Sequence, residues 1–259
     1  MKIVKYYKHK LRCADIWMPF GFIDHKDLDL VCVFDSREKA YVKNKRILCR
    51  YTLITDIDLP SEAIFSSFAS KTLRYDIRKN ENENVSFKVF NSQELKHNQK
   101  ILELFQDCYR EMFKEKGMSS VLNPKVLERY IDADALFLTV AFCENSPTVF
   151  HSYVDYENGV RLWHSCSLFR EDKETASLIG RTNKRLHYED MVFFSKIGKK
   201  EYDWGGVFSL ESNDNGIDRF KKSFGGKGIC IFSDTYGISF KGKMFVFFSK
   251  LKRRFKKHG

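Results

Sequence analysis

Three short apolar stretches follow one another in the middle of the chain, and they constrain its fold more than any other feature. They are Ala135–Phe142, Thr148–Tyr156 and Val160–Leu168, each of a length suited to one strand. The last two are joined by Glu157-Asn158-Gly159, and Asn-Gly is a strong short-range signal for a β-hairpin. A helical pattern from about Glu174 to Ile197 follows. We therefore expect an antiparallel meander that leads into a long helix.

The segments on either side of this meander alternate between helix and strand. Before it, Leu95–Lys116 carries apolar residues at helical spacing, and Pro124 marks the start of another helix. The first 70 residues read as mixed strands and turns, with a helix that begins at Ser61. This order predicts an α+β fold with a mixed central sheet flanked by helices. The other expected elements are strands at Leu28–Phe34, Arg46–Leu53, Val85–Val89, Glu201–Trp204 and Gly228–Phe232 and a helix at Asn215–Phe224, whereas Thr72–Asn80 is simply polar and basic.

Composition excludes several classes of protein. The 259 residues are 43% hydrophobic and 15% aromatic, which is typical of a folded globular chain and not of a disordered one. The seven cysteines are scattered and none forms a C-x-x-C pair, so we expect neither a disulfide framework nor a zinc site. The sequence shows no apolar signal-peptide core and no run of about 18 apolar residues. We therefore expect a cytoplasmic protein that is soluble or peripheral at the inner face of the membrane.

The positive charge is concentrated at the C-terminal end. The formal net charge is +11, yet Lys241–Gly259 holds eight Lys and Arg and no acidic residue, which leaves 37 basic and 34 acidic residues elsewhere. This composition is typical of a helix that lies on an anionic membrane surface. Two alternatives are a helix that packs its apolar residues on the body and a segment that binds tRNA. The tail's apolar stripe consists of Met244, Phe247, Phe248, Leu251 and Phe255.

Two glycine-rich segments resemble the signature of the Fem-type transferases. Tyr202–Gly206 (YDWGG) is followed by Gly216–Gly226 (GIDRFKKSFGG). The family pattern is roughly Y-D-F-G-G, a variable loop, then G-[IL]-x-x-F-K-x-x-F-G-G, so Trp204 replaces Phe. The helix before them, Leu186–Gly198, is similar to the family's L-x-[WY]-E helix ending in Gly. The resemblance covers about residues 70–232.

The resemblance implies a single-domain member with the GNAT fold of acyl-CoA N-acyltransferases. Residues 71–236 would form the transferase domain, residues 1–70 a small α/β extension or degenerate half of a Fem-type pair, and residues 237–259 the basic tail. In that fold the acyl carrier lies in a V-shaped gap beside a splayed strand, for which Val160–Leu168 is our candidate. The helical arm of the tRNA-using members has no counterpart in this sequence.

Transfer of an acyl group to an amine needs a base and a group that stabilises the oxyanion. Asp203 matches the family motif at the end of a short strand and is our first candidate for a catalytic carboxylate, although it could instead cap the following loop. His164 on the candidate splayed strand and His151 on the strand before it are further candidates for the general base, because an imidazole as such titrates near neutrality. Glu189 matches the family helix, with an ion pair to Arg185 as its alternative role.

The donor and acceptor assignments also follow the resemblance. Lys221 would face the donor channel, where its charge could offset a phosphate or an oxyanion, and Phe220 lies beside it. The alternative is a solvated basic helix face. Gly180 and Arg181 could bind a phosphate, although the glycine spacing of acetyl-CoA enzymes is absent. We expect no metal ion and no bound cofactor. The acceptor would lie against Tyr202, Trp204, Gly205 and Gly206.

These observations predict an N-acyltransferase of surface-glycan assembly, with acyl-CoA as donor and a nucleotide- or lipid-linked amino-sugar as acceptor. The first alternative is an aminoacyl-tRNA-dependent transferase that acts on a peptidoglycan or other envelope precursor. The second is a catalytically inactive protein of the same fold that binds RNA or membrane through its basic tail. The acyl group, the acceptor and the oligomeric state stay open at this point.

Overall fold

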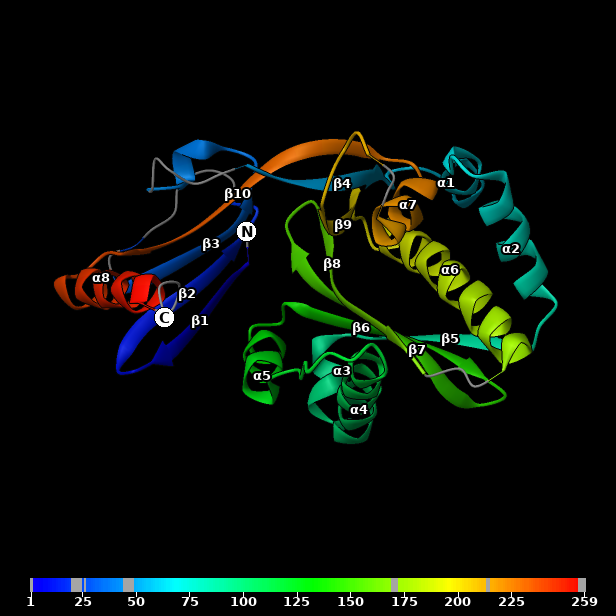
Figure 1. Ribbon diagram of the computed structural model, residues 1–259, viewed down its shortest axis with the longest axis horizontal. Coiled ribbons are helices and arrows are strands. Elements are labelled where there is room, and N and C mark those ends of the chain that lie inside the picture. The colour runs from blue at the N-terminus through cyan, green and yellow to red at the C-terminus, as the bar shows by residue number, and fades with distance from the viewer. Residues whose placement is uncertain are drawn as a thin grey trace. The chain divides into compact units, whose positions relative to one another are not determined.

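The chain forms two compact units in the computed structural model, and we describe each by itself (Figure 1). The structure describes residues 2–19, 25, 27–43, 49–168, 172–212 and 215–255, with only the backbone course for 251–255. The smaller unit comprises residues 1–50 and 230–259, and the larger one residues 51–229. This division differs from the domains 1–70, 71–236 and 237–259 expected from the sequence. The difference arises because the C-terminal strand and helix complete the N-terminal sheet.

The smaller unit is built on four strands in the order β1-β2-β3-β10. Strand β1 (Ile3–Lys8) pairs antiparallel with β2 (Leu11–Trp17), β2 pairs parallel with β3 (Leu30–Ser36), and β3 pairs antiparallel with β10 (Lys227–Gly237). A single turn of 3-10 helix, Lys39–Tyr41, follows β3. The last strand of the chain thus pairs with one of the first.

Helix α8 (Phe240–Phe255) covers one face of this sheet. Its Phe245 and Val246 pack against Leu11, Cys13 and Leu30. The other face carries a separate apolar cluster that includes Ala14, Ile16, Val31, Val33 and Tyr236. The alternation of side chains along β2 and β3 explains the two clusters, because neighbouring residues of a strand point to opposite faces.

One disulfide corrects the expectation that the cysteines stay unpaired. Cys49 and Cys230 are joined, with Cα atoms 5.7 Å apart and 181 residues between them in sequence. Both cysteines belong to the smaller unit, whose two parts are far apart in sequence, so spacing along the chain could not reveal the pairing. The five other cysteines are free, and Cys13, Cys108 and Cys166 are buried as small hydrophobes. Among the described helices, none is long and apolar enough to cross a membrane.

The larger unit contains six strands in the order β4-β9-β8-β7-β6-β5. The expected meander is present as β6 (Leu136–Cys143), β7 (Ser146–Tyr156) and β8 (Gly159–Ser167), all antiparallel. Strand β9 (Glu201–Val207) is parallel to β8, which confirms that both belong to one sheet. The sheet is completed by β4 (Arg50–Asp56) beside β9 and β5 (Val85–Phe90) beside β6.

Helices cover both faces of this sheet, which confirms the α+β class. On β7, Phe150 contacts Phe105 of α4, whereas the next residue, His151, contacts Asp190 of α6. Since consecutive strand residues point to opposite faces, α4 and α6 lie on opposite sides. In Figure 1, α1, α2 and α7 lie near α6, and α3 and α5 lie near α4. The helices are α1 (Ser61–Ser67), α2 (Lys71–Glu81), α3 (Ser92–Lys96), α4 (Gln99–Glu115), α5 (Pro124–Asp132), α6 (Lys173–Lys196) and α7 (Gly216–Ser223).

Candidate functional site

The pairing of β8 with β9 ends part-way along both strands. The register runs from Gly159↔Glu201 to Arg161↔Asp203, although β8 continues to Ser167 and β9 to Val207. Beyond this point β9 pairs with β4, and β8 keeps its pairing with β7. Within the described residues, the two central strands therefore separate after the Arg161–Asp203 pair. Their backbone groups can face a ligand there.

A bulge in β8 lies directly after the point of separation. Leu162 pairs with Tyr153 of β7, but the next residue in register is His164, opposite Ser152. Trp163 is the extra residue, and its ring packs 4.5 Å from the ring of Tyr130. A bulge re-aims the backbone of a strand, and bulges are frequent beside active sites.

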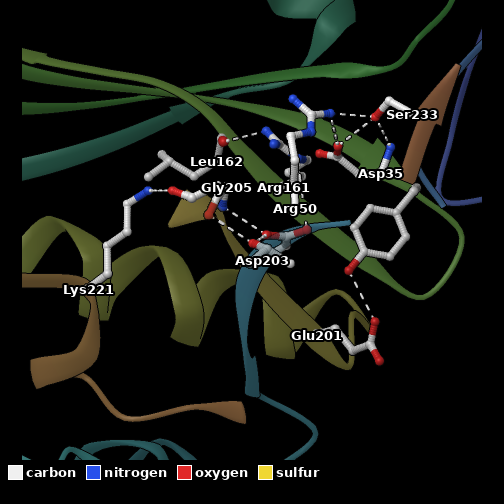
Figure 2. A network of polar contacts seen from close by, with 12 residues as sticks. Asp35, Arg50, Arg161, Leu162, Glu201, Asp203, Gly205, Lys221 and Ser233 are labelled. Atoms are coloured by element: carbon white, nitrogen blue, oxygen red, sulfur yellow. Dashed lines mark hydrogen bonds and ion pairs between the residues drawn. The ribbon is translucent and has the colours of Figure 1, made fainter. Parts of the chain in front are cut away.

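Asp203 holds the turn at which β9 leaves β8 (Figure 2). Its Oδ1 accepts a hydrogen bond from the Gly205 N–H at 2.8 Å and lies 2.5 Å from the Thr52 hydroxyl. Its Oδ2 lies 3.9 Å from Nε of Arg161, and the carboxylate is completely buried. These contacts match the capping role that the sequence left open, because they orient the turn and not a solvent-facing substrate. A catalytic role of Asp203 stays a prediction.

Gly205 is required by this geometry. It has a φ of +70°, and a Cβ at this position would lie 2.9 Å from the carbonyl oxygen of Leu162. A residue with a side chain would be strained there and would push the two strands apart.

Lys221 reaches from α7 to the separated part of β9. Its ammonium donates a hydrogen bond of 2.8 Å to the carbonyl oxygen of Gly206 (Figure 2). Gly206 itself is an exposed residue. Burial and, to a smaller extent, the Arg161 guanidinium lower the pKa of Lys221 to about 8, although Asp203 and Asp218 partly offset these two effects. A partly desolvated cation therefore lies beside Gly206, and its role in donor binding stays a prediction. The neighbouring Lys222 points elsewhere and donates to the Ser212 carbonyl oxygen.

The other predicted donor residues have structural partners. The guanidinium of Arg181 forms a two-pronged contact with the carboxylate of Glu83, with its Nε 3.0 Å from Oε1. This contact ties α6 to the end of α2 and uses the charge that was expected to bind phosphate. Gly180 lies inside α6 with open space around its Cα, and Phe220 packs its ring on those of His187 and Phe224. None of these contacts supports a role in donor binding.

His164 is placed on the separated part of β8. Its Nδ1 lies 2.8 Å from the hydroxyl of Ser152, and Tyr109 packs edge-on against its ring. Burial and the charge of Arg161 lower its pKa to about 4, so the imidazole is neutral at physiological pH. Glu189, in contrast, bonds to Arg185 at 3.2 Å, the alternative that its spacing indicated. It lines a hollow of about 210 Å³ beside β5, four strands away from β9, so the structure does not bring it to the site.

The two predicted aromatic acceptor residues lie in the core. Tyr202 and Trp204 are both completely buried, and the Trp204 indole N–H donates to the hydroxyl of Thr55 at 2.9 Å. Neither ring reaches the surface in this structure. Gly205 is buried too, so the acceptor prediction depends on Gly206, which is exposed.

Tyr202 is part of a buried chain of hydrogen bonds that was not predicted from the sequence. The Tyr153 hydroxyl donates to Asp190 at 2.5 Å and lies 2.7 Å from the Tyr202 hydroxyl. The Tyr202 hydroxyl lies 2.7 Å from Nδ1 of His187. Because each hydroxyl carries one proton, Tyr202 donates to Tyr153 and accepts from His187. His187 is therefore protonated on Nδ1, and burial, His151 and Lys221 lower its pKa. The signal available in the sequence was the two-residue spacing of His151 and Tyr153, which places both on one face of the apolar strand β7.

His151, His187 and Asp190 are close enough to suggest a metal site, but their geometry does not fit one. The two imidazole rings are stacked, with centroids 3.9 Å apart and an angle of 21° between planes. Their ring nitrogens therefore lie in nearly parallel planes and do not converge on one point. Both nitrogens of His151 also have partners, Asp190 and Asn183, each at 2.8 Å.

Comparison with known proteins shows the fold. No family model and no curated protein matches the sequence. Among solved structures, FemX superposes with a TM-score of 0.62 at 12% identity, over 90% of this chain and 83% of FemX. L-PGS from Bacillus licheniformis gives 0.52 at 14% identity, over 96% and 89%. The C-terminal domain of an Agrobacterium fabrum protein described as a lysylphosphatidylglycerol synthetase gives 0.56 at 11% identity, over 96% and 84%. The chain has the fold of the Fem-like transferases.

Proposed function

We propose that this protein is an N-acyltransferase that moves an acyl group from acyl-CoA to the amine of an amino-sugar in bacterial surface-polysaccharide assembly. The observation that carries the proposal is the separation of β8 from β9 after Arg161, with the cation of Lys221 beside the separated strand. Attack on a thioester is favoured at such an unpaired strand segment, because its backbone N–H groups can hold the carbonyl and stabilise the oxyanion. The Fem-like fold of the chain agrees with this reading.

The reaction assigns separate tasks to these groups. The amine nitrogen attacks the acyl carbon, the C–S bond breaks, and the thiolate leaves as the amine loses a proton. Lys221, with a pKa of about 8, is mostly charged at pH 7 and is suited to stabilise the oxyanion or a donor phosphate. Neutral His164 on β8 is the proton acceptor best placed by strand geometry. Asp203 positions the turn through Gly205.

An aminoacyl-tRNA is the second candidate donor, with a peptidoglycan or other envelope precursor as acceptor. Its support is the similarity to FemX and to L-PGS, whose fold this chain shares. Acyl-CoA is preferred because the sequence carries no heptad-repeat hairpin that would correspond to the helical arm of tRNA-using members. The third candidate, an inactive RNA- or membrane-binding protein, needs neither donor.

The α8 helix supports a peripheral position at an anionic membrane. Phe245 and Val246 pack on the sheet, whereas Met244, Phe247 and Phe248 are 39%, 57% and 56% exposed. The described residues of the expected apolar stripe therefore face away from the sheet of the smaller unit. The sequence from Lys241 onward holds eight Lys and Arg and no acidic residue, a composition suited to anionic headgroups.

Thermal shift followed by turnover tests the proposal. CoA should raise the melting temperature if acyl-CoA is the donor, deacylated tRNA if tRNA is, and neither if the protein is inactive. Release of free thiol from acetyl-CoA in the presence of glucosamine derivatives then measures transfer. Lys221→Ala should lower the rate at least tenfold, whereas Arg219→Ala, on the exposed side of the same helix, should leave it unchanged. Equal effects of both variants would overturn the role of Lys221.

A further inference from the structure

The smaller unit contains a cavity of about 460 Å³ between α8 and the sheet face that this helix covers. Strands β1, β3 and β10 line one side of it and α8 lines the other. Its volume lies within the range of about 300–1,000 Å³ that is usual for ligand sites. It lies entirely within residues 1–50 and 230–259, and no residue proposed above for acyl transfer lines it.

The lining is mixed, and its apolar part lies where β3 meets α8. Leu30 and Phe34 from β3 face Phe245 and Val246 from α8. Phe34 is stacked on Trp17 behind it, with ring centroids 4.6 Å apart, which fixes the position of this lining ring. These side chains can bury part of an acyl chain, because each CH₂ removed from water favours binding.

The polar groups of the lining are neutral or already bonded. Burial raises the pKa of the Cys32 thiol to about 11, so it stays protonated, and the Thr235 hydroxyl donates to its sulfur. The Tyr6 hydroxyl donates to Asp15 at 2.9 Å. The carboxylate of Asp234 accepts backbone N–H bonds from Lys43 at 2.9 Å and from Thr235 at 2.8 Å. The acidic residue of the lining, Asp234, therefore has its carboxylate engaged by backbone donors.

Two exposed lysines complete the lining. Lys8 ends β1 and Lys250 lies on α8, so the charged groups come from opposite sides of the cavity. Since both are solvent-exposed, they mark its opening. An apolar patch inside the cavity with cations at the opening is complementary to a molecule with one apolar chain and an anionic head.

We propose that this cavity binds the acyl chain of one acidic phospholipid, whose phosphate is held between Lys8 and Lys250. The exposed apolar face of α8 makes a leaflet the natural source of such a molecule, because the helix that would contact the headgroups also forms one wall of the cavity. The bound lipid would fix the protein to anionic membrane in a defined orientation, in addition to the diffuse attraction of the tail. This inference does not depend on the transferase activity.

Native mass spectrometry and fluorescence of the full chain test the proposal with lysophosphatidylglycerol below its micelle concentration. We expect a saturable 1:1 complex and a change in tryptophan emission, since Trp17 packs on the cavity wall. Lysophosphatidylcholine, with the same chain and no net charge, should bind more weakly. The double variant Lys8→Glu/Lys250→Glu should lose at least about twentyfold in affinity, from about fivefold for each lysine removed.

The matched control is Lys241→Glu/Lys243→Glu, which makes the same charge change at exposed positions of α8 outside the cavity. It should change affinity less than about threefold. Ser249→Trp fills the cavity from the helix side and should abolish the 1:1 complex; if circular dichroism shows that it does not fold, the charge variants decide. Equal losses in the two charge pairs, equal binding of both lipids or competition by free CoA would each overturn the proposal. Loss of transfer activity with intact lipid binding would instead count against the transferase function alone.

Discussion

Replacing Lys221 by methionine should stabilise the protein while it removes the proposed catalytic cation. Folding lowers the pKa of this lysine from 10.5 to about 8, chiefly by burial. Its charged form is therefore less stable in the folded state than in the unfolded chain. A shift of that size corresponds to at most about 3 kcal/mol at neutral pH. Because the side chain is only partly buried, screening reduces the expected gain for the neutral variant to about 1–2 kcal/mol.

The pH dependence provides the sharper test. Between pH 8 and pH 10.5 the unfolded chain holds more protons on this lysine than the folded protein, so wild-type stability rises with pH in this window. The advantage of Lys221→Met, a rise in Tm of about 3–6 °C at pH 7, should therefore shrink towards pH 10. Differential scanning calorimetry of both proteins measures the difference and cancels the other titrations.

The control for this experiment is Arg219→Met, which makes a comparable apolar change on the exposed face of α7. It should shift Tm by less than about 1 °C at every pH. A lower Tm for Lys221→Met at pH 7, or an advantage that does not change up to pH 10, would refute the reasoning. The lower Tm would show that the hydrogen bond to Gly206 outweighs the cost of desolvation.

Four further predictions concern the turn, the buried chain and α8. Asp203→Asn should lower the free energy of unfolding by about 1–3 kcal/mol in urea titrations, with kcat reduced less than tenfold; a loss of 10² or more at unchanged stability would show that the carboxylate is the base instead. Gly205→Ala should destabilise by at least about 1–2 kcal/mol, because its φ is +70°, and an unchanged urea midpoint would contradict this. Tyr202→Phe should release the tautomer of His187, seen as a change in its ¹⁵N shifts, and a spectrum like that of wild type would exclude the chain of donors derived above. Phe247→Ser/Phe248→Ser should reduce co-sedimentation with acidic vesicles at unchanged Tm, because both rings are exposed; equal sedimentation would remove the membrane role.

The elements with a strong apolar period could be predicted from the sequence. The meander and the helix after it appear as β6, β7, β8 and α6, with ends within a few residues of the expected ones. Helix α2 was not recognised, because only Leu73, Ile77 and Asn80 of its eleven residues are buried and the rest of Lys71–Glu81 is polar. Its start was marked by Ser70, whose side chain accepts the Leu73 N–H.

The candidate site was harder to predict, because its geometry depends on contacts between distant segments. The motif located Asp203 and Lys221 correctly on β9 and α7, but only the structure shows that the carboxylate is enclosed by Thr52, which is 151 residues away in sequence. The partner of Arg181, Glu83, is likewise 98 residues away. A sequence pattern identifies which residue types are present and cannot show which of them already have a partner.

The sequence offered a membrane helix and a packed helix as alternatives for the tail, and the fold does not exclude either. The packed-helix interpretation holds for Phe245 and Val246, whereas the membrane interpretation stays a prediction for the exposed face of α8. Deleting Lys241–Gly259, expected from the sequence to leave a folded protein, would remove Phe245 and Val246 from the smaller unit. Point substitutions on the exposed face are therefore the cleaner experiment.

The pairing of β3 with β10 has a consequence for synthesis of the chain. The smaller unit cannot close until the ribosome has made the last strand, since its two halves are separated by the whole of the larger unit. At about 5–20 residues per second, the delay between β3 and β10 is roughly ten to forty seconds. During that time β3 has an unsatisfied edge, which is a template for wrong pairing with other chains. The larger unit, continuous in sequence, can fold within this interval, so we expect newly made chains to depend on chaperones chiefly through their first fifty residues.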